Sequence, residues 1–256
     1  MIIPIEEAAM SPTPRNLAVL EKFNFERQPV GVKFLATRPK GLKKPDKQLD
    51  FCEMLVEVQQ GNAFYVTKED FTCIGPLLLG MIAEEPIFES GRVGPKLGVF
   101  RDQRANRRIY QYLPRLAKNS VSYVAFAPLD KLSFEPDLLI VMASVSQAEI
   151  FIRAKSYTTG ETWSARGTAA AGCAWLYLYP YLTGEMNMTV TGFGFGMKSR
   201  RLFPEGNVLL SIPWDKLPQI ISSLEEMEWV PESYTLGKEG HKKKVKKIVE
   251  ELKKEE

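Results

Sequence analysis

The sequence predicts an α+β protein in which a mixed β-sheet is covered by helices within a single compact domain. Strand-like and helix-like segments interleave without a regular repeat, and some neighbouring strands have no helix between them, which disfavours a strictly parallel fold. There is no internal repeat, and no linker is long enough to separate two domains. A chain of 256 residues has the size of one large domain.

The first third of the chain alternates between helix and strand. Apolar residues at helical spacing predict a helix near residues 14–24, and the alternating, β-rich "PVGVKFLAT" predicts a strand at 30–37. In "LDFCEMLVEVQQGN" the apolar residues share one face of a helix that begins near residue 51 and ends at Gly61. The segment "AFYVTKED" then predicts a short strand that ends in a polar turn.

The rest of the chain continues this alternation. The apolar segment "DLLIVMAS" suits the middle of a sheet, and the small and aromatic residues of "GTAAAGCAWLYLYPYLTG" suit a buried helix. The predicted strands are 120–129, 137–144, 186–196 and 207–214, and the predicted helices are 104–117, 144–158, 167–184 and 215–228.

The C-terminal segment differs in composition from the preceding chain. We therefore divide the sequence into an α+β domain at 1–237 and a basic amphipathic helix at 238–256. An apolar stripe runs along this helix opposite the lysines, and it consists of Val245, Ile248, Val249 and Leu252. We expect the stripe to dock on the domain. The abundance of Lys and Glu is typical of a thermophile.

Charge and hydropathy narrow the classes of partner. A formal net charge of +3 is too small to predict nucleic-acid binding. A basic, aromatic stretch at 101–115 is interpreted as an exposed helix face or as one side of a homo-oligomer interface. No apolar run is long enough to cross a bilayer, and no cleavable signal segment is present. We therefore expect a cytoplasmic protein that has no membrane partner.

The single histidine limits the chemistry of the chain. His241 lies in the lysine-rich C-terminal segment, where a solvated charge is its expected role. Catalysis by Ser-His-Asp or Cys-His needs an imidazole beside the nucleophile, and HExxH zinc sites need two histidines. A transition-metal site in this chain would therefore depend mainly on thiolate ligands.

Three cysteines, Cys52, Cys73 and Cys173, are either separate core residues or ligands of one site. Free cysteine is among the most buried residue types, which favours the first interpretation. An odd number in a reducing cytosol disfavours a disulfide framework. In favour of a shared site, Cys52 and Cys73 lie near predicted helix starts, where the helix dipole lowers a thiol pKa. Cys173 lies among small residues that leave space beside it.

The surroundings of the cysteines are similar to those of a known family. A cysteine heads a helix that ends in glycine, and a short strand, a turn and "C-x-G-x-x-x-L-G" follow within "FCEMLVEVQQGNAFYVTKEDFTCIGPLLLGM". The segment "GTAAAGCAWLYLYP" and the glycine-rich turn continue the pattern. Over residues 15–230 the chain resembles domain of unknown function 169 (DUF169), an archaeal and bacterial family without a settled activity. The resemblance implies cysteines at these three positions and often another near the glycine-rich turn, where this sequence has "TGFGFG" instead.

We therefore expect Cys52, Cys73 and Cys173 to bind an iron–sulfur cluster, in particular [4Fe–4S]. Three thiolates bind three irons, which leaves the fourth open to redox or Lewis-acid chemistry. Glu53 and either Lys198 or Arg200 are the expected polar neighbours.

Two alternatives stay open beside the cluster. The same three thiolates and a water suit zinc. A non-catalytic module with structural cysteines is the other alternative, with "WLYLYPY", Phe193 and Phe195 lining a pocket for an apolar small molecule or a tetrapyrrole. A small-molecule ligand or an electron-transfer partner is compatible with these interpretations.

Overall fold

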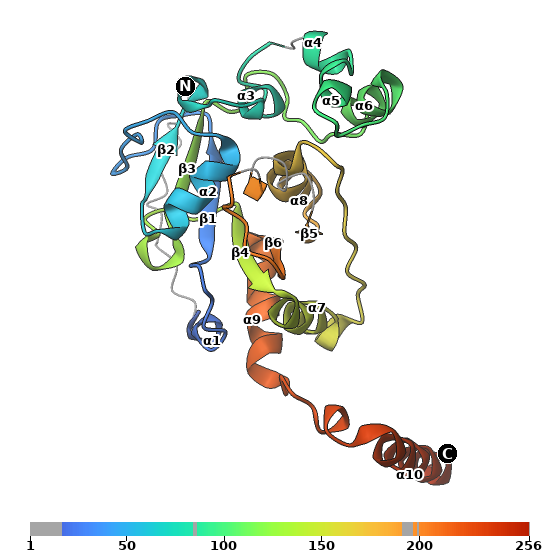
Figure 1. Cartoon of the computed structure of the whole chain (residues 1–256). Helices are drawn as coiled ribbons and strands as arrows, with labels where there is room; N and C mark the ends of the chain where they lie inside the picture. The colour runs from blue at the N-terminus through green and yellow to red at the C-terminus, as the bar shows by residue number, and fades with distance from the viewer. Residues whose placement is uncertain (1–16, 84–85, 191–196, 199, 256) are drawn as a thin grey trace, which may run out of the picture.

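The computed structural model describes residues 17–83, 86–190, 197–198 and 200–255, which are built around a six-stranded β-sheet (Figure 1). The strands are β1 (Val30–Leu35), β2 (Phe64–Val66), β3 (Tyr123–Pro128), β4 (Leu138–Ser144), β5 (Asn187–Thr189) and β6 (Asn207–Pro213). Their spatial order is β2-β3-β1-β4-β6-β5. Helices cover the sheet, so the predicted α+β class and single compact domain are confirmed.

The pairing within the sheet differs from the predicted mixed arrangement. Each neighbouring pair of these strands is antiparallel. The physical reason is that the hydrophobic pattern of a segment shows whether it is extended and how deeply it is buried. The pattern does not show which strand will be its neighbour or in which direction that neighbour runs.

Strand β4 lies in the middle of the sheet, as its apolar sequence predicts. It pairs with β1 on one side and with β6 on the other. Successive side chains of a strand face opposite sides, so Ile140 belongs to one core cluster and its neighbour Val141 to another. The sheet is therefore buried on both faces.

The first face of the sheet packs against the segments that carry the cysteines. These segments include α2 (Phe51–Gln59), α3 (Gly75–Leu78), a π-helical segment (Ala174–Leu178) and α8 (Tyr179–Thr183). Phe51 stacks on Tyr177 with ring centroids 4.4 Å apart, which joins α2 to the π-helical segment. The helix expected at 167–184 begins only near Cys173, because Ala171 has a left-handed backbone conformation with φ of 54°.

The opposite face packs against α1 (Ala18–Glu21), α7 (Val145–Thr159) and α9 (Leu217–Glu226). Helix α7 starts with a capping box between Ser144 and Gln147 and stops at Gly160, whose φ is 67°. The helices expected at 144–158 and 215–228 therefore match α7 and α9 closely. Helix α1 lies within the expected range 14–24, whose first residues are outside the described part of the chain.

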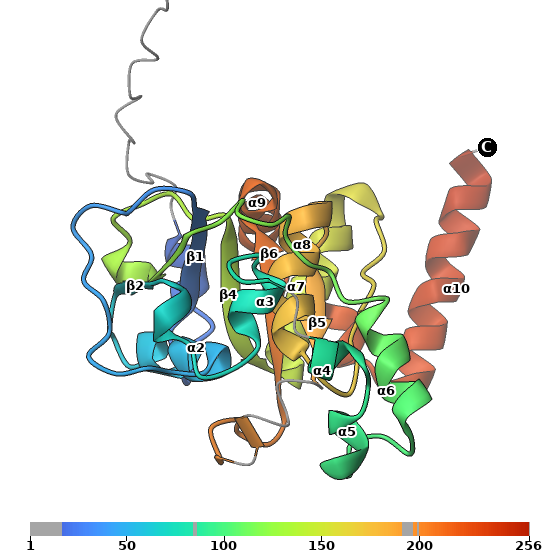
Figure 2. The ribbon, with the colours of Figure 1, turned by 90° about the horizontal axis from the view of Figure 1, so that it is seen from above.

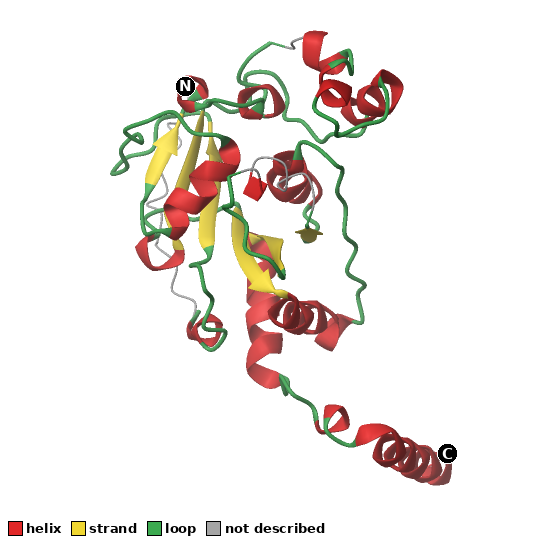
Figure 3. Ribbon diagram, in the orientation of Figure 1, coloured by secondary structure: helices red, strands yellow, loops and turns green. Residues whose placement is uncertain are grey.

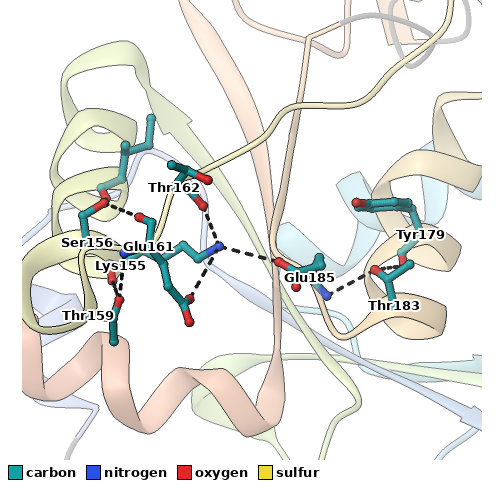
Figure 4. A network of polar contacts seen from close by, with 9 residues as sticks. Lys155, Ser156, Thr159, Glu161, Thr162, Tyr179, Thr183 and Glu185 are labelled. Carbon is teal, nitrogen blue, oxygen red and sulfur yellow. Dashed lines mark hydrogen bonds and ion pairs between the residues drawn. The ribbon is translucent and has the colours of Figure 1, made fainter.

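A buried lysine connects α7 to the chain that follows α8 (Figure 4). The Nζ of Lys155 donates to the carbonyl oxygen of Thr162 at 2.9 Å, and it lies 3.6 Å from the carboxylate of Glu185. A buried ammonium group without partners is costly, so these contacts are needed for the observed packing.

An arm of three short helices extends from the first face, above the sheet in the view of Figures 1 and 3. Its helices are α4 (Pro86–Glu89), α5 (Val93–Lys96) and α6 (Gln103–Tyr110). Helix α6 is shorter than the expected 104–117, because Pro114 lacks the N–H that a helix interior needs and Leu113 and Leu116 turn into the core. Arg104 and Arg107 are exposed, in agreement with an exposed basic helix face.

Helix α10 (Gly237–Glu255) confirms a C-terminal helix, but the expected docking of its apolar stripe is wrong. The four residues of the stripe are 43–55 % exposed, and the helix projects from the rest of the chain (Figures 1 and 2). Ion pairs one turn apart, Lys246–Glu250 and Lys247–Glu251, stabilise the helix locally. The amphipathic pattern predicted the helix correctly. It did not show whether another part of the protein has an apolar surface on which the stripe could pack.

Deletion of residues 237–256 is expected to change the free energy of unfolding by less than about 1 kcal/mol, because no residue of α10 is buried. Urea-induced unfolding followed by circular dichroism measures this change. A loss of several kcal/mol would show that the helix packs on the domain in solution.

Candidate functional site

All three cysteines line one pocket of about 410 Å³ between the first face of the sheet and the arm of short helices. Cys52 comes from α2, Cys73 from the turn before α3, and Cys173 from the residue that precedes the π-helical segment. Each is half-buried and is a free thiol. The fold thus brings together cysteines that lie far apart in the sequence.

The position of Cys52 follows from the start of α2. Asp50 is the N-cap residue, and the Glu53 carboxylate accepts a hydrogen bond from the Asp50 N–H at 2.8 Å, as in a capping box. Cys52 is the second residue of the helix, so its thiol lies beside the positive end of the helix dipole.

Backbone hydrogen bonds hold Cys73. Its Sγ accepts from the N–H of Phe51 at 3.3 Å and from the N–H of Gly75 at 3.4 Å. A Cβ at Gly75 would lie 2.6 Å from the ring of Phe71, so a side chain at this position would force the turn apart. The glycine of the "C-x-G" motif therefore keeps the Cys73 sulfur against the first turn of α2.

Small residues and a strained backbone position Cys173. Ala170, Ala171 and Gly172 line the pocket beside it, and the left-handed Ala171 turns the chain into the π-helical segment. Asn187, which is fully buried in β5, donates to the carbonyl oxygen of Trp175 at 2.8 Å. This bond fixes the helical segment that carries Cys173. Short π-helical segments occur often at functional sites.

The electrostatics of the thiols differ from the sequence-based expectation. Burial, together with the smaller effect of the neighbouring Asp50 carboxylate, raises the pKa of Cys52 to about 12. Burial also raises the pKa of Cys73 against the lowering effect of its two backbone hydrogen bonds, and it raises the pKa of Cys173 well above the usual range. The cost of burying a thiolate therefore exceeds the effect of the helix starts.

The three thiols also influence one another. The charge of the Cys73 thiolate raises the pKa of both Cys52 and Cys173. This mutual repulsion acts only over short distances, so the sulfurs share one electrostatic environment. A ligand that binds them as thiolates must displace their protons, which makes its binding dependent on pH.

A polar edge of the pocket contains Asp50, Thr72 and Arg200. The Arg200 guanidinium forms ion pairs with the carboxylates of Asp50 and, at 3.1 Å, of Glu53. Arg200 thus lines the pocket as expected, and Glu53 is connected to it through their ion pair without lining the pocket. Lys198 is exposed and is not among the lining residues.

The opposite wall of the pocket is apolar and comes from the arm. The lining residues there are Phe88, Val93, Gly94, Leu97, Val99, Phe100, Asn106 and Tyr110. The sequence did not indicate this wall, because its residues occur in short helices and loops without a clear periodicity.

The aromatic segment that we expected to line a pocket is instead part of the core. Trp175 and Tyr177 are buried and are absent from the pocket lining. Their rings pack inward because the segment lies flat on the first face of the sheet. Phe193 and Phe195 lie outside the described residues.

Two searches of the described residues gave negative results. They contain no group of three or more His, Cys, Asp and Glu side chains that could hold a metal ion. None of their helices has the length and apolar character that crossing a membrane requires.

Comparison with known proteins identifies a family but no activity. An uncharacterized protein of the archaeon Methanocaldococcus jannaschii is 25 % identical over 219 residues, which cover 83 % of this chain and 93 % of that protein. No solved structure matches the chain. The model of the family described as "Uncharacterised ArCR", DUF169, matches residues 19–223. This match covers most of the sequence and the whole cysteine pocket, and the chain therefore belongs to the DUF169 family.

Proposed function

We propose that the protein binds an iron–sulfur cluster, [4Fe–4S], through Cys52, Cys73 and Cys173. The observation that carries the proposal is the convergence of three free thiols, from three separate segments, on one pocket. Three unrelated core cysteines would have no reason to share a cavity, since each could pack in its own part of the core.

The donor set favours a cluster over a single metal ion. Three sulfurs that bind one zinc ion lie only about 4 Å from one another, because each Zn–S bond is about 2.3 Å long. Three sulfurs that each bind a different iron of a cluster are spaced more widely, at about 6–7 Å. We expect the wider spacing for the three thiols that line this pocket.

The surroundings of the sulfurs suit a cluster with one open position. A [4Fe–4S] cluster on three thiolates supplies one-electron chemistry and, at the iron without a cysteine, Lewis acidity. The N–H groups of Phe51 and Gly75 donate to the Cys73 sulfur, and such hydrogen bonds raise the reduction potential of a cluster. The apolar wall limits the access of water to the site.

A non-catalytic binding module is the second candidate, favoured by the same apolar wall. In this alternative the pocket takes a small molecule and the thiols are only lining residues. A zinc site and a tetrapyrrole site are the remaining competitors, and an absorption spectrum together with metal analysis separates all four.

Purification under strictly anaerobic conditions, followed by absorption spectroscopy and metal analysis, tests the proposal. We expect a brown protein with broad absorbance near about 400 nm and about four irons and four sulfides per chain. A sharp Soret band would establish a tetrapyrrole, and zinc without iron would establish a zinc site. A colourless protein that stays free of metal after incubation with ferrous iron and sulfide would contradict the cluster.

A further inference from the structure

The side of the pocket that the arm forms is lined mainly by apolar side chains, which are not needed to hold a group bound to the three sulfurs. The side chains of Phe88, Leu97 and Phe100 line it together with two valines. Leu97 is 54 % exposed in spite of its apolar character. A pocket of about 410 Å³ lies within the size range of small-molecule sites, about 300–1,000 Å³.

One buried amide interrupts this apolar wall. Asn106 is only 3 % exposed and is a lining residue of the pocket. Across the described parts of the chain, its side-chain amide has no hydrogen-bond partner. The amide is not among the fully buried polar atoms that lack a partner, so it opens into the pocket, where a ligand with a matching polar group can pair with it.

The packing of the arm holds this amide in place. A Cβ at Gly94 would lie 2.7 Å from the Cγ of Asn106 and 2.4 Å from the ring of Phe100. The glycine thus allows α5 to approach α6 closely. Asp102 caps α6 by accepting from the N–H of Ala105 at 3.0 Å, which fixes the helix that carries Asn106.

The charges at the polar edge disfavour an anionic ligand. Asp50 and Glu53 contribute two negative charges and Arg200 contributes one positive charge, which leaves one net negative charge. Both ion pairs already occupy the guanidinium. A carboxylate or phosphate would therefore meet repulsion, and the described lining residues include no second cation to bind it.

We propose that the pocket binds an uncharged ligand with an apolar body and one amide-like or carbonyl group that pairs with Asn106. The inference rests on the proposed function, because it assigns the remaining space beside the cysteines of the same site. The apolar body contacts Phe88, Leu97 and Phe100, and the polar group ends at the amide of Asn106. Such a ligand pairs with the one side-chain amide that lines the pocket among the described residues.

Ligand-detected NMR titrations with benzamide, toluene and benzoate test the proposal. We expect benzamide to bind more tightly than toluene, and benzoate to bind more weakly than benzamide. In the Asn106→Leu variant, the affinity for benzamide should fall about tenfold, the value of one hydrogen bond, while the affinity for toluene is retained. Equal affinity of wild type and variant for benzamide, or a preference for benzoate, would overturn the proposal.

A second variant tests the same wall of the pocket in case Asn106→Leu does not fold. Leu97→Glu places a carboxylate on the apolar wall at an exposed position that a folded chain tolerates, and it should weaken both benzamide and toluene binding. The matched control is Leu182→Glu, because Leu182 is 51 % exposed on α8 and does not line the pocket. Similar effects of both variants would contradict the assigned wall.

Titrations of the apoprotein and of the iron-loaded protein separate the two proposals. Benzamide binding that depends on Asn106, in a protein that never takes up iron, would contradict the cluster and support the ligand class. Iron uptake without benzamide binding in either form would support the cluster and contradict the ligand class.

Discussion

Replacement of Cys73 with serine is expected to reduce the iron and sulfide that the reconstituted protein retains by about tenfold or more. A hydroxyl group is a hard ligand and binds the iron of a sulfide cluster poorly compared with a thiolate. The serine oxygen has nearly the shape of the thiol and can still accept from the N–H of Phe51 and the N–H of Gly75. The fold should therefore persist while the ligand is lost.

Iron and acid-labile sulfide per chain, measured after anaerobic reconstitution and gel filtration, provide the readout. Thr72→Ser is the matched control, because Thr72 precedes Cys73 in the same turn, lines the pocket and keeps its hydroxyl contact with Asp50 when only a methyl group is removed. The control should retain iron like the wild type. Equal retention by Cys73→Ser and Thr72→Ser would show that the thiol is not a ligand.

Replacement of Phe51 with alanine is expected to lower the free energy of unfolding by about 3–5 kcal/mol, the usual cost of removing a buried aromatic ring. Phe51 is 1 % exposed, stacks on Tyr177, and meets Phe71 edge-on with centroids 5.4 Å apart. Its ring thus joins α2, the turn before α3 and the π-helical segment. These are the three segments that carry the cysteines.

Phe51→Leu fills most of the cavity and should cost clearly less than Phe51→Ala. Chemical denaturation gives the stability of both variants in the apoprotein. Iron retention should follow the same order, because a loosened Phe51 lets the three segments move apart. A cost below about 1 kcal/mol for the alanine variant would contradict the packing described for this core.

The sequence was sufficient to predict the elements that position two of the cysteines. The N-cap Asp50 and Glu53 three residues later form a recognisable capping box, and "C-x-G" contains a glycine whose need follows from the ring of Phe71. Local hydrogen bonds and sterics determine both features, so residues near each other in the chain reveal them. The central place of β4 was also predictable from its continuous apolar run.

Features that depend on distant packing were not predictable. The helix starts at Cys52 and Cys73 predicted lowered thiol pKa values, whereas burial by segments far away in the sequence raises them. The amide of Asn106 becomes part of the site only because the arm folds over the cysteines. The stripe of α10 has a docking pattern, yet none of its residues is buried against the described part of the chain.

The spacing of the three sulfurs and the presence of iron between them are tested most directly by an anaerobic crystal structure with anomalous diffraction data at the iron edge. The account predicts a compact iron peak in the pocket, within bonding distance of the sulfurs of Cys52, Cys73 and Cys173, which lie about 6–7 Å apart. No iron peak in crystals of protein reconstituted with iron and sulfide, or a peak that contacts fewer than three of these sulfurs, would contradict it.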